Sequence, residues 1–144
     1  MTVAAILKHK GHQVTTVVPT ATIAEVAEVL ATHRIGAALV MDRADQLLGI
    51  ISERDIVRSL AANGGHTLEM TAGQLMTRAL QIASPDTTVE EAMHMMTEGR
   101  FRHLPVIDHG RVAGLISIGD VVKARIMQQA HEVDSLRAYV AGAA

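Results

Sequence analysis

Short, unbroken runs of apolar residues alternate along this chain with stretches in which an apolar residue returns every three or four positions. The continuous apolar run at 35–41, which contains Gly36, has the length of a strand buried on both faces. The segments 14–18, in which two threonines lie among valines, and 47–51 are also predicted to be strands. The stretch from Thr22 has helical spacing, and Thr22 with Glu25 forms the pattern of a capping box. A polar turn at 42–46 separates two of the strands, and a second helix is expected to begin behind Ser52. The pattern therefore predicts the order strand, helix, strand, strand, helix.

This order of elements occurs twice. Thr22 corresponds to Thr88 at an offset of 66 residues, and Ser52 corresponds to Ser117 at an offset of 65, so one residue has been lost from the polar turn of the second copy. A register held over about forty residues with a single slip at a loop indicates a duplicated unit. Each copy is too small to bury its faces well, so we expect two β-α-β-β-α units that pack together in an α+β fold. The last helix is expected to run long, to Tyr139, and to contact a partner subunit.

Each copy carries the same polar corner between a strand and a helix. An apolar run that contains one glycine ends at a serine, and an aspartate follows three residues later, as Ser52 with Asp55 and as Ser117 with Asp120. A helix start presents unpaired N–H groups and the positive end of the helix dipole, so a hydroxyl and a carboxylate there can meet a phosphate and its sugar. The same spacing also makes a helix capping box without any ligand, and the two roles can coexist.

The composition narrows the function classes. The chain has 144 residues, of which 49% are hydrophobic, and its net charge of -2 without a basic run argues against nucleic acid as a partner. Only Phe101 and Tyr139 are aromatic and cysteine is absent, which argues against base-stacking platforms and excludes disulfides and thiolate sites. No apolar stretch is long enough to span a bilayer and no signal-peptide pattern starts the chain, so we expect a cytoplasmic protein with no membrane partner.

No pattern in the sequence predicts catalysis or a metal. A P-loop, a glycine-rich dinucleotide fingerprint and a cysteine nucleophile are all missing, so we expect a protein that is not an enzyme and has no catalytic cofactor. His9 and His12 are three residues apart, but Gly11 interrupts the helix that would align them, and no carboxylate completes a site. His94 lies among methionines, which favours packing over ligation.

The motifs of this chain resemble those of one family. The duplicated corner, the run Arg102-His103-Leu104-Pro105-Val106 and the run Ser117-Ile118-Gly119-Asp120-Val121-Val122-Lys123 are similar to those of stand-alone bacterial CBS-domain pairs, named after cystathionine β-synthase. The resemblance covers residues 3–123. It implies tandem CBS repeats at 3–62 and 72–125, packed about a pseudo-twofold axis, with a C-terminal helical extension at 126–144. Members of this family bind adenine ligands such as AMP, ADP, ATP, NAD or S-adenosylmethionine in two clefts between the repeats.

The resemblance also implies site residues. In the family, the aspartate of each corner holds ribose hydroxyls and the hydroxyl residue meets phosphate, roles that fall here on Ser52, Asp55, Ser117 and Asp120. The adenine slots would be lined in the first copy by Thr16, Ile35, Gly36, Ala37 and Ala38, and in the second copy by Ile82, Phe101, Arg102, His103, Leu104 and Pro105. The copies differ in that the second adds Arg100 and has Gly119 where the first has Arg54.

From these features we expect a regulatory module that senses an adenine nucleotide, with AMP as the first candidate. The alternative is an adaptor whose clefts are vestigial and which acts through dimerisation and contacts with an effector protein.

We expect a homodimer, because helix faces such as 26–30 and 92–96 offer apolar surface beyond what one pair of repeats can bury. Because Arg100, Arg102 and His103 bring positive charge to the second copy, AMP binding is expected to depend more on Asp120 than on Asp55.

Overall fold

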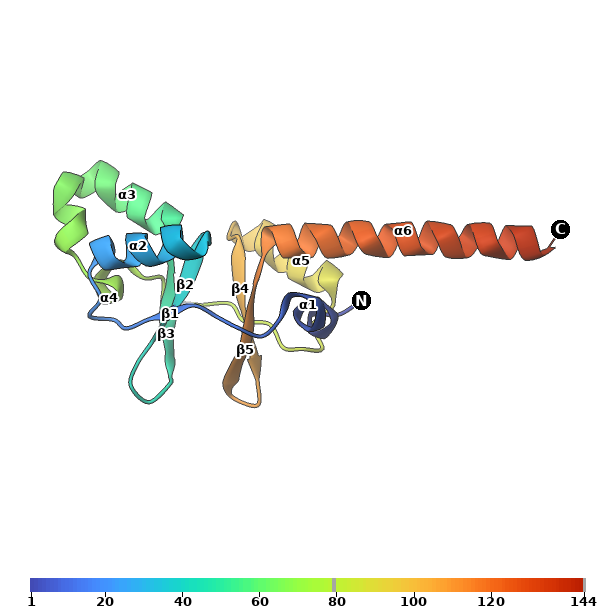
Figure 1. Cartoon of the computed structure of the whole chain (residues 1–144), viewed down its shortest axis with the longest axis horizontal. Coiled ribbons are helices and arrows are strands. Elements are labelled where there is room, and N and C mark those ends of the chain that lie inside the picture. Colours follow the sequence, from blue (N-terminus) through green and yellow to red (C-terminus); the bar gives the residue numbers. More distant parts are fainter. Residues whose placement is uncertain (79, 144) are drawn as a thin grey trace. The chain divides into compact units, whose positions relative to one another are not determined.

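A computed structural model of the chain describes residues 1–78 and 80–143 and divides into two compact units (Figure 1). The central unit consists of residues 13–80, and the terminal unit combines residues 1–12 with the segment from Gln81 onward. Residue 144, the end of the predicted extension at 126–144, lies outside the described residues. Helices and small sheets occur in both units, which confirms the expected α+β class.

The central unit is built on a three-stranded sheet. Its elements in chain order are β1 (Thr16–Val17), α2 (Ile23–His33), β2 (Ala37–Met41), β3 (Leu47–Ser52), α3 (Glu53–Asn63), the 3₁₀ helix η1 (Gly64–Glu69) and α4 (Ala72–Leu75). Strand β2 lies in the middle, parallel to β1 and antiparallel to β3. Thr22 and Glu25 form the predicted capping box at the start of α2. Ile23 and Val26 of α2 pack against Ile51 of β3 in the core of this unit.

The terminal unit repeats this plan with one strand fewer. Its elements are α1 (Val3–Lys10), α5 (Val89–Gly99), β4 (His103–Asp108), β5 (Arg111–Ser117) and α6 (Ile118–Ala143). Strands β4 and β5 pair antiparallel, and the predicted first strand of the second copy is only an isolated parallel bridge between Ala83 and Val106. The first copy has a β-branched run at 15–18, whereas the second has Ala83 and Ser84, which have low strand propensity.

The first helix of each repeat packs on the strands of the other repeat. Val3 and Leu7 of α1 share a core with Leu104 and Ile116 in the terminal unit. In the central unit, Ala72 of α4 and Met76 just after it belong to the core of the first repeat. A glycine in each corner strand allows this close approach: a Cβ at Gly114 would lie 2.6 Å from Leu7 Cδ2, and one at Gly49 would lie 2.6 Å from the Thr77 carbonyl oxygen. The compact units and the sequence repeats therefore have different boundaries.

The helix faces proposed for dimerisation are covered within their own units. Val26 and Leu30 are buried in the central core, and Ala92 and Met96 are buried in the terminal core, so the physical reason given for a homodimer is wrong. Exposed large apolar side chains gather instead on α3 and on the outer part of α6. None of the helices in the described part of the chain combines the length and hydropathy of a membrane span.

Candidate functional site

The first candidate site is the corner at which β3 meets α3, here called the Ser52–Asp55 corner. Ser52 Oγ accepts a hydrogen bond from the Asp55 N–H at 3.3 Å, and Asp55 Oδ2 accepts from the Ser52 N–H at 2.8 Å and from the Ser52 hydroxyl at 2.9 Å. This confirms the capping box. The bonds described for the Asp55 carboxylate all go to Oδ2, so Oδ1 remains an acceptor at the positive end of an 11-residue helix.

The sheet places the predicted residues of the first slot next to this corner. Ala37 pairs with Ser52 across β2 and β3, and the Gly36 carbonyl accepts a hydrogen bond from the Glu53 N–H at 2.9 Å. Ile35 and Gly36 are half-buried just before β2, whereas the side chains of Ala37 and Ala38 are buried in the core. Thr16 is exposed on β1, opposite Leu39, and Arg54 is exposed in the first turn of α3.

The second candidate site is the corner at which β5 meets α6, here called the Ser117–Asp120 corner. Asp120 Oδ2 accepts a hydrogen bond from the Ser117 N–H at 2.8 Å, and Ser117 Oγ accepts one from the Asp120 N–H at 3.1 Å. His103 pairs with Ser117 across the sheet, and the Arg102 carbonyl accepts from the Ile118 N–H at 2.8 Å. The backbone thus reproduces the geometry of the first corner.

The remaining predicted residues of the second copy have different degrees of exposure. Leu104 and Pro105 are buried in β4, and Phe101 is half-buried against the core of the terminal unit. Exposed positions are Ile82 before the bridge, Arg100 with a left-handed backbone at the end of α5, Arg102, and Gly119 in the first turn of α6. Any ligand contact at Leu104 or at the buried alanines of β2 would come from backbone atoms, because their side chains lie in the core.

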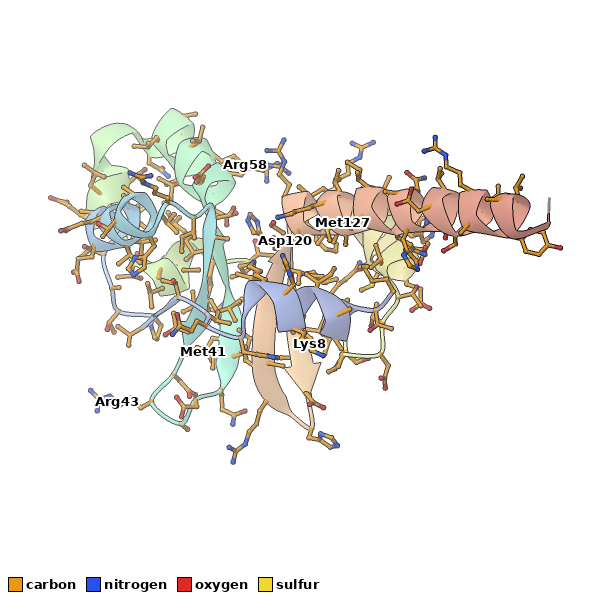
Figure 2. The ribbon with its side chains drawn as sticks, turned by 45° about the vertical axis from the view of Figure 1, so that its right-hand side comes forward. Lys8, Met41, Arg43, Arg58, Asp120 and Met127 are labelled. Carbon is orange, nitrogen blue, oxygen red and sulfur yellow. The ribbon has the colours of Figure 1, made fainter. Side chains whose placement is uncertain are left out.

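A lysine that the sequence analysis missed occupies the second corner. Lys10, the last residue of α1, places its Nζ 2.6 Å from Asp120 Oδ2 and 2.8 Å from the Leu115 carbonyl oxygen. Figure 2 shows Asp120 at the junction of β5 and α6, on the side of α1. Burial raises the pKa of Asp120, but the hydrogen bond and charge of Lys10, together with the Ser117 N–H, bring that pKa below its usual value. Within the described part of the central unit, Asp55 has no comparable ion pair.

Removing Lys10 is expected to make the protein less stable in a pH-dependent way. A carboxyl group whose pKa is lower in the folded than in the unfolded state stabilises the folded protein at pH values above its unfolded pKa, which is near 3.8 for Asp120. This stabilisation is lost as the pH falls through the pKa of the folded state. Lys10→Met should therefore lower the free energy of unfolding by about 1 kcal/mol at pH 7, since the pair is partly exposed. The difference from the unmodified chain should shrink as the pH falls below the unfolded pKa of Asp120.

Urea denaturation over a series of pH values measures this difference. Lys8→Met is the matched control, because Lys8 is an exposed lysine on the same helix (Figure 2). A stability difference for Lys10→Met that does not change with pH would show that the ion pair with Asp120 does not cause it.

The described residues contain no cluster of three histidine or acidic side chains that could hold a metal ion. Comparison with known families gives one match, to the CBS domain, at residues 5–62 and 72–127. The two matched segments contain the Ser52–Asp55 and Ser117–Asp120 corners, one each.

Individual relatives and solved structures match most of this chain. A mitochondrial CBS domain-containing protein of Arabidopsis thaliana is 35% identical over 125 residues, which make up 84% of this chain but only 61% of that relative. The crystal structure of a CBS-domain protein from Agrobacterium tumefaciens has a TM-score of 0.85 and 44% identity, and the match covers 87% of this chain and 99% of that one.

Two further solved structures similar to this chain contain adenine compounds. A CBS-domain protein of Pyrobaculum aerophilum complexed with AMP has a TM-score of 0.74 and 28% identity, with 83% of this chain and 89% of that chain covered. The CBS-domain pair of protein MJ0100, in complex with 5′-methylthioadenosine and S-adenosyl-L-methionine, has a TM-score of 0.78 and 27% identity, with 89% and 98% covered.

Proposed function

Because this chain belongs to the CBS-domain family and contains a tandem pair of CBS repeats, we propose that it is a non-catalytic regulatory module that senses an adenine ligand at its Ser-x-x-Asp corners, with the Ser52–Asp55 corner as the main site for AMP. AMP is the first candidate, and ADP, ATP, NAD and S-adenosylmethionine are the others. The solved relatives with bound AMP, 5′-methylthioadenosine and S-adenosyl-L-methionine support an adenosine moiety as the shared element.

The observation that carries this proposal is the geometry of the Ser52–Asp55 corner. A carboxylate oxygen, a serine hydroxyl and the N–H groups of a helix start lie within a few residues of one another. A carboxylate accepts hydrogen bonds from the two hydroxyls of a ribose, while a hydroxyl and helix-start N–H groups donate to phosphate oxygens. Each part of a nucleoside monophosphate other than the base thus has a chemical counterpart at this corner.

The adaptor function remains a second candidate, supported by one observation. Both Ser/Asp pairs are reciprocal capping boxes, and capping alone accounts for all the hydrogen bonds between serine and aspartate described at the corners. An adaptor would keep these residues for the stability of α3 and α6 and would act on an effector protein without a small ligand.

Thermal unfolding distinguishes the two functions. A ligand that binds only the folded protein stabilises it by RT ln(1 + [L]/Kd), about 2.7 kcal/mol at a hundredfold excess over Kd. We therefore expect AMP to raise the melting temperature of ligand-free protein, with GMP and CMP as matched controls that have smaller effects. If no adenine compound at millimolar concentration shifts the melting curve, the sensor function is wrong and the adaptor function takes its place.

A further inference from the structure

Helix α6 continues well past the part that packs on its own unit (Figure 1). Val121 and Ala124, near its start, are buried in the core of the terminal unit. Every described side chain from His131 to Gly142 is exposed. A partner that covers the large apolar residues on this outer part would stabilise the helix, because helices in proteins gain most of their stability from packing an apolar face.

Five of the seven exposed large apolar residues described on α6 follow a heptad repeat, and Met127 and Tyr139 lie outside it. Ile126, Val133 and Val140 are seven residues apart, and their exposed fractions are 61%, 47% and 60%. Val122, Gln129 and Leu136 form a second series with the same spacing, placed three residues after the positions of the first series. The two series, which together we call the α6 stripe, have the spacing of the a and d positions of a coiled coil. β-Branched residues at a with leucine at d favour two parallel strands. All three a positions here are β-branched, and one of the three d positions is a leucine, Leu136, which is 63% exposed.

The charges beside the α6 stripe determine the direction of pairing. The e positions carry Lys123, Ala130 and Arg137, and the g positions carry Arg125, Glu132 and Tyr139. Arg125 is already paired with Glu90 of its own unit, and in a parallel pair it would face the uncharged Ala130. In a parallel pair, a g residue faces the e residue of the next heptad on the partner helix, so Glu132 of each copy meets Arg137 of the other. An antiparallel pair would instead place e positions opposite e positions and g positions opposite g positions. Lys123 of one chain would then lie near Arg137 of the other, and the two Glu132 side chains would lie near each other, so like charges would meet. Charge complementarity therefore favours the parallel arrangement.

We propose that two copies of this chain associate through the α6 stripe as a parallel, two-stranded coiled coil. The side of α6 that faces its own unit remains packed, because Val121 and Ala124 lie outside the a and d positions. The residues of the α6 stripe make none of the hydrogen bonds described at either corner.

Sedimentation equilibrium tests the role of the α6 stripe. At micromolar concentration the unmodified protein should sediment with twice the 15.4 kDa mass of a single chain. Leu136→Glu should raise the Kd of the dimer at least tenfold. Ala138→Glu is the matched control, because Ala138 is exposed on the same helix at an f position, and it should leave the dimer unchanged. A monomeric unmodified chain would overturn the proposal and assign the stripe to another protein. A dimer that tolerates Leu136→Glu would overturn it as well.

A cysteine cross-link tests the parallel direction. The chain has no cysteine, so Val140→Cys introduces a single thiol near the far end of α6. In a parallel pair the two copies of position 140 face each other, and mild oxidation should give a covalent dimer. Ala138→Cys, on the outer side of the helix, should give little covalent dimer. Failure of Val140→Cys to cross-link, or equal cross-linking by both variants, would overturn the parallel coiled coil.

Discussion

Asp55→Ala is expected to weaken AMP binding about tenfold to a hundredfold, because a ribose that loses a charged acceptor loses hydrogen bonds of about 1.5–3 kcal/mol. Titration calorimetry on ligand-free protein measures this loss directly. The fold should survive, since the acidic member of a capping box contributes only about 1 kcal/mol to stability. Asp120→Ala, the same substitution at the equivalent residue of the second repeat, should have the smaller effect on affinity.

A second substitution separates binding from capping. Glu25 closes the capping box of α2 in the same unit as Asp55, and its side chain accepts from the backbone N–H of Thr22. Glu25→Ala should therefore cost about as much stability as Asp55→Ala while leaving the AMP affinity unchanged. If both variants bind AMP like the unmodified chain, the Ser52–Asp55 corner is only a helix cap.

The expectation for Asp55 reverses the one drawn from the sequence, and Lys10 is the reason. The hydroxyl of Ser52 is a neutral group that can rotate away from Asp55 and donate to a phosphate at little cost. Lys10 is instead held to Asp120 by a charge-assisted hydrogen bond, which is about twice as strong as a neutral one. A ribose must compete with that cation at the second corner, whereas no ion pair of the Asp55 carboxylate is described within the central unit.

The sequence could not reveal this difference, because 110 residues separate Lys10 from Asp120. The capping boxes were predictable because each depends on residues three positions apart, and the long α6 was predictable from its helical spacing. Periodicity says which face of a helix is apolar but not what covers it. For this reason the buried faces of α2 and α5 were mistaken for a free dimer surface, and the packing of α1 on the second repeat went unseen.

The exchange of first helices also changes the surroundings of the second corner. Because α1 packs on β5, its last residue reaches the Ser117–Asp120 corner, so a lysine of the first repeat contacts the corner aspartate of the second. In the central unit, Arg78, which follows α4, donates a hydrogen bond to the Gly73 carbonyl. Two corners with the same backbone geometry thus differ in the described partners of their aspartates, and this difference is the basis on which we expect unequal AMP binding.

Lys10→Met is accordingly expected to add a second AMP site to the chain. The substitution removes the cation from Asp120 Oδ2 and leaves that oxygen with the Ser117 N–H as its described partner, close to the state of Asp55. Titration calorimetry should show a higher AMP stoichiometry than in the unmodified chain, whereas Lys8→Met should leave it unchanged.

Adding Asp120→Ala to Lys10→Met should abolish the second site, because the acceptor for the ribose is then missing. If Lys10→Met instead weakens AMP binding, Lys10 is itself a ligand for the phosphate, and the second corner rather than the first is the main nucleotide site.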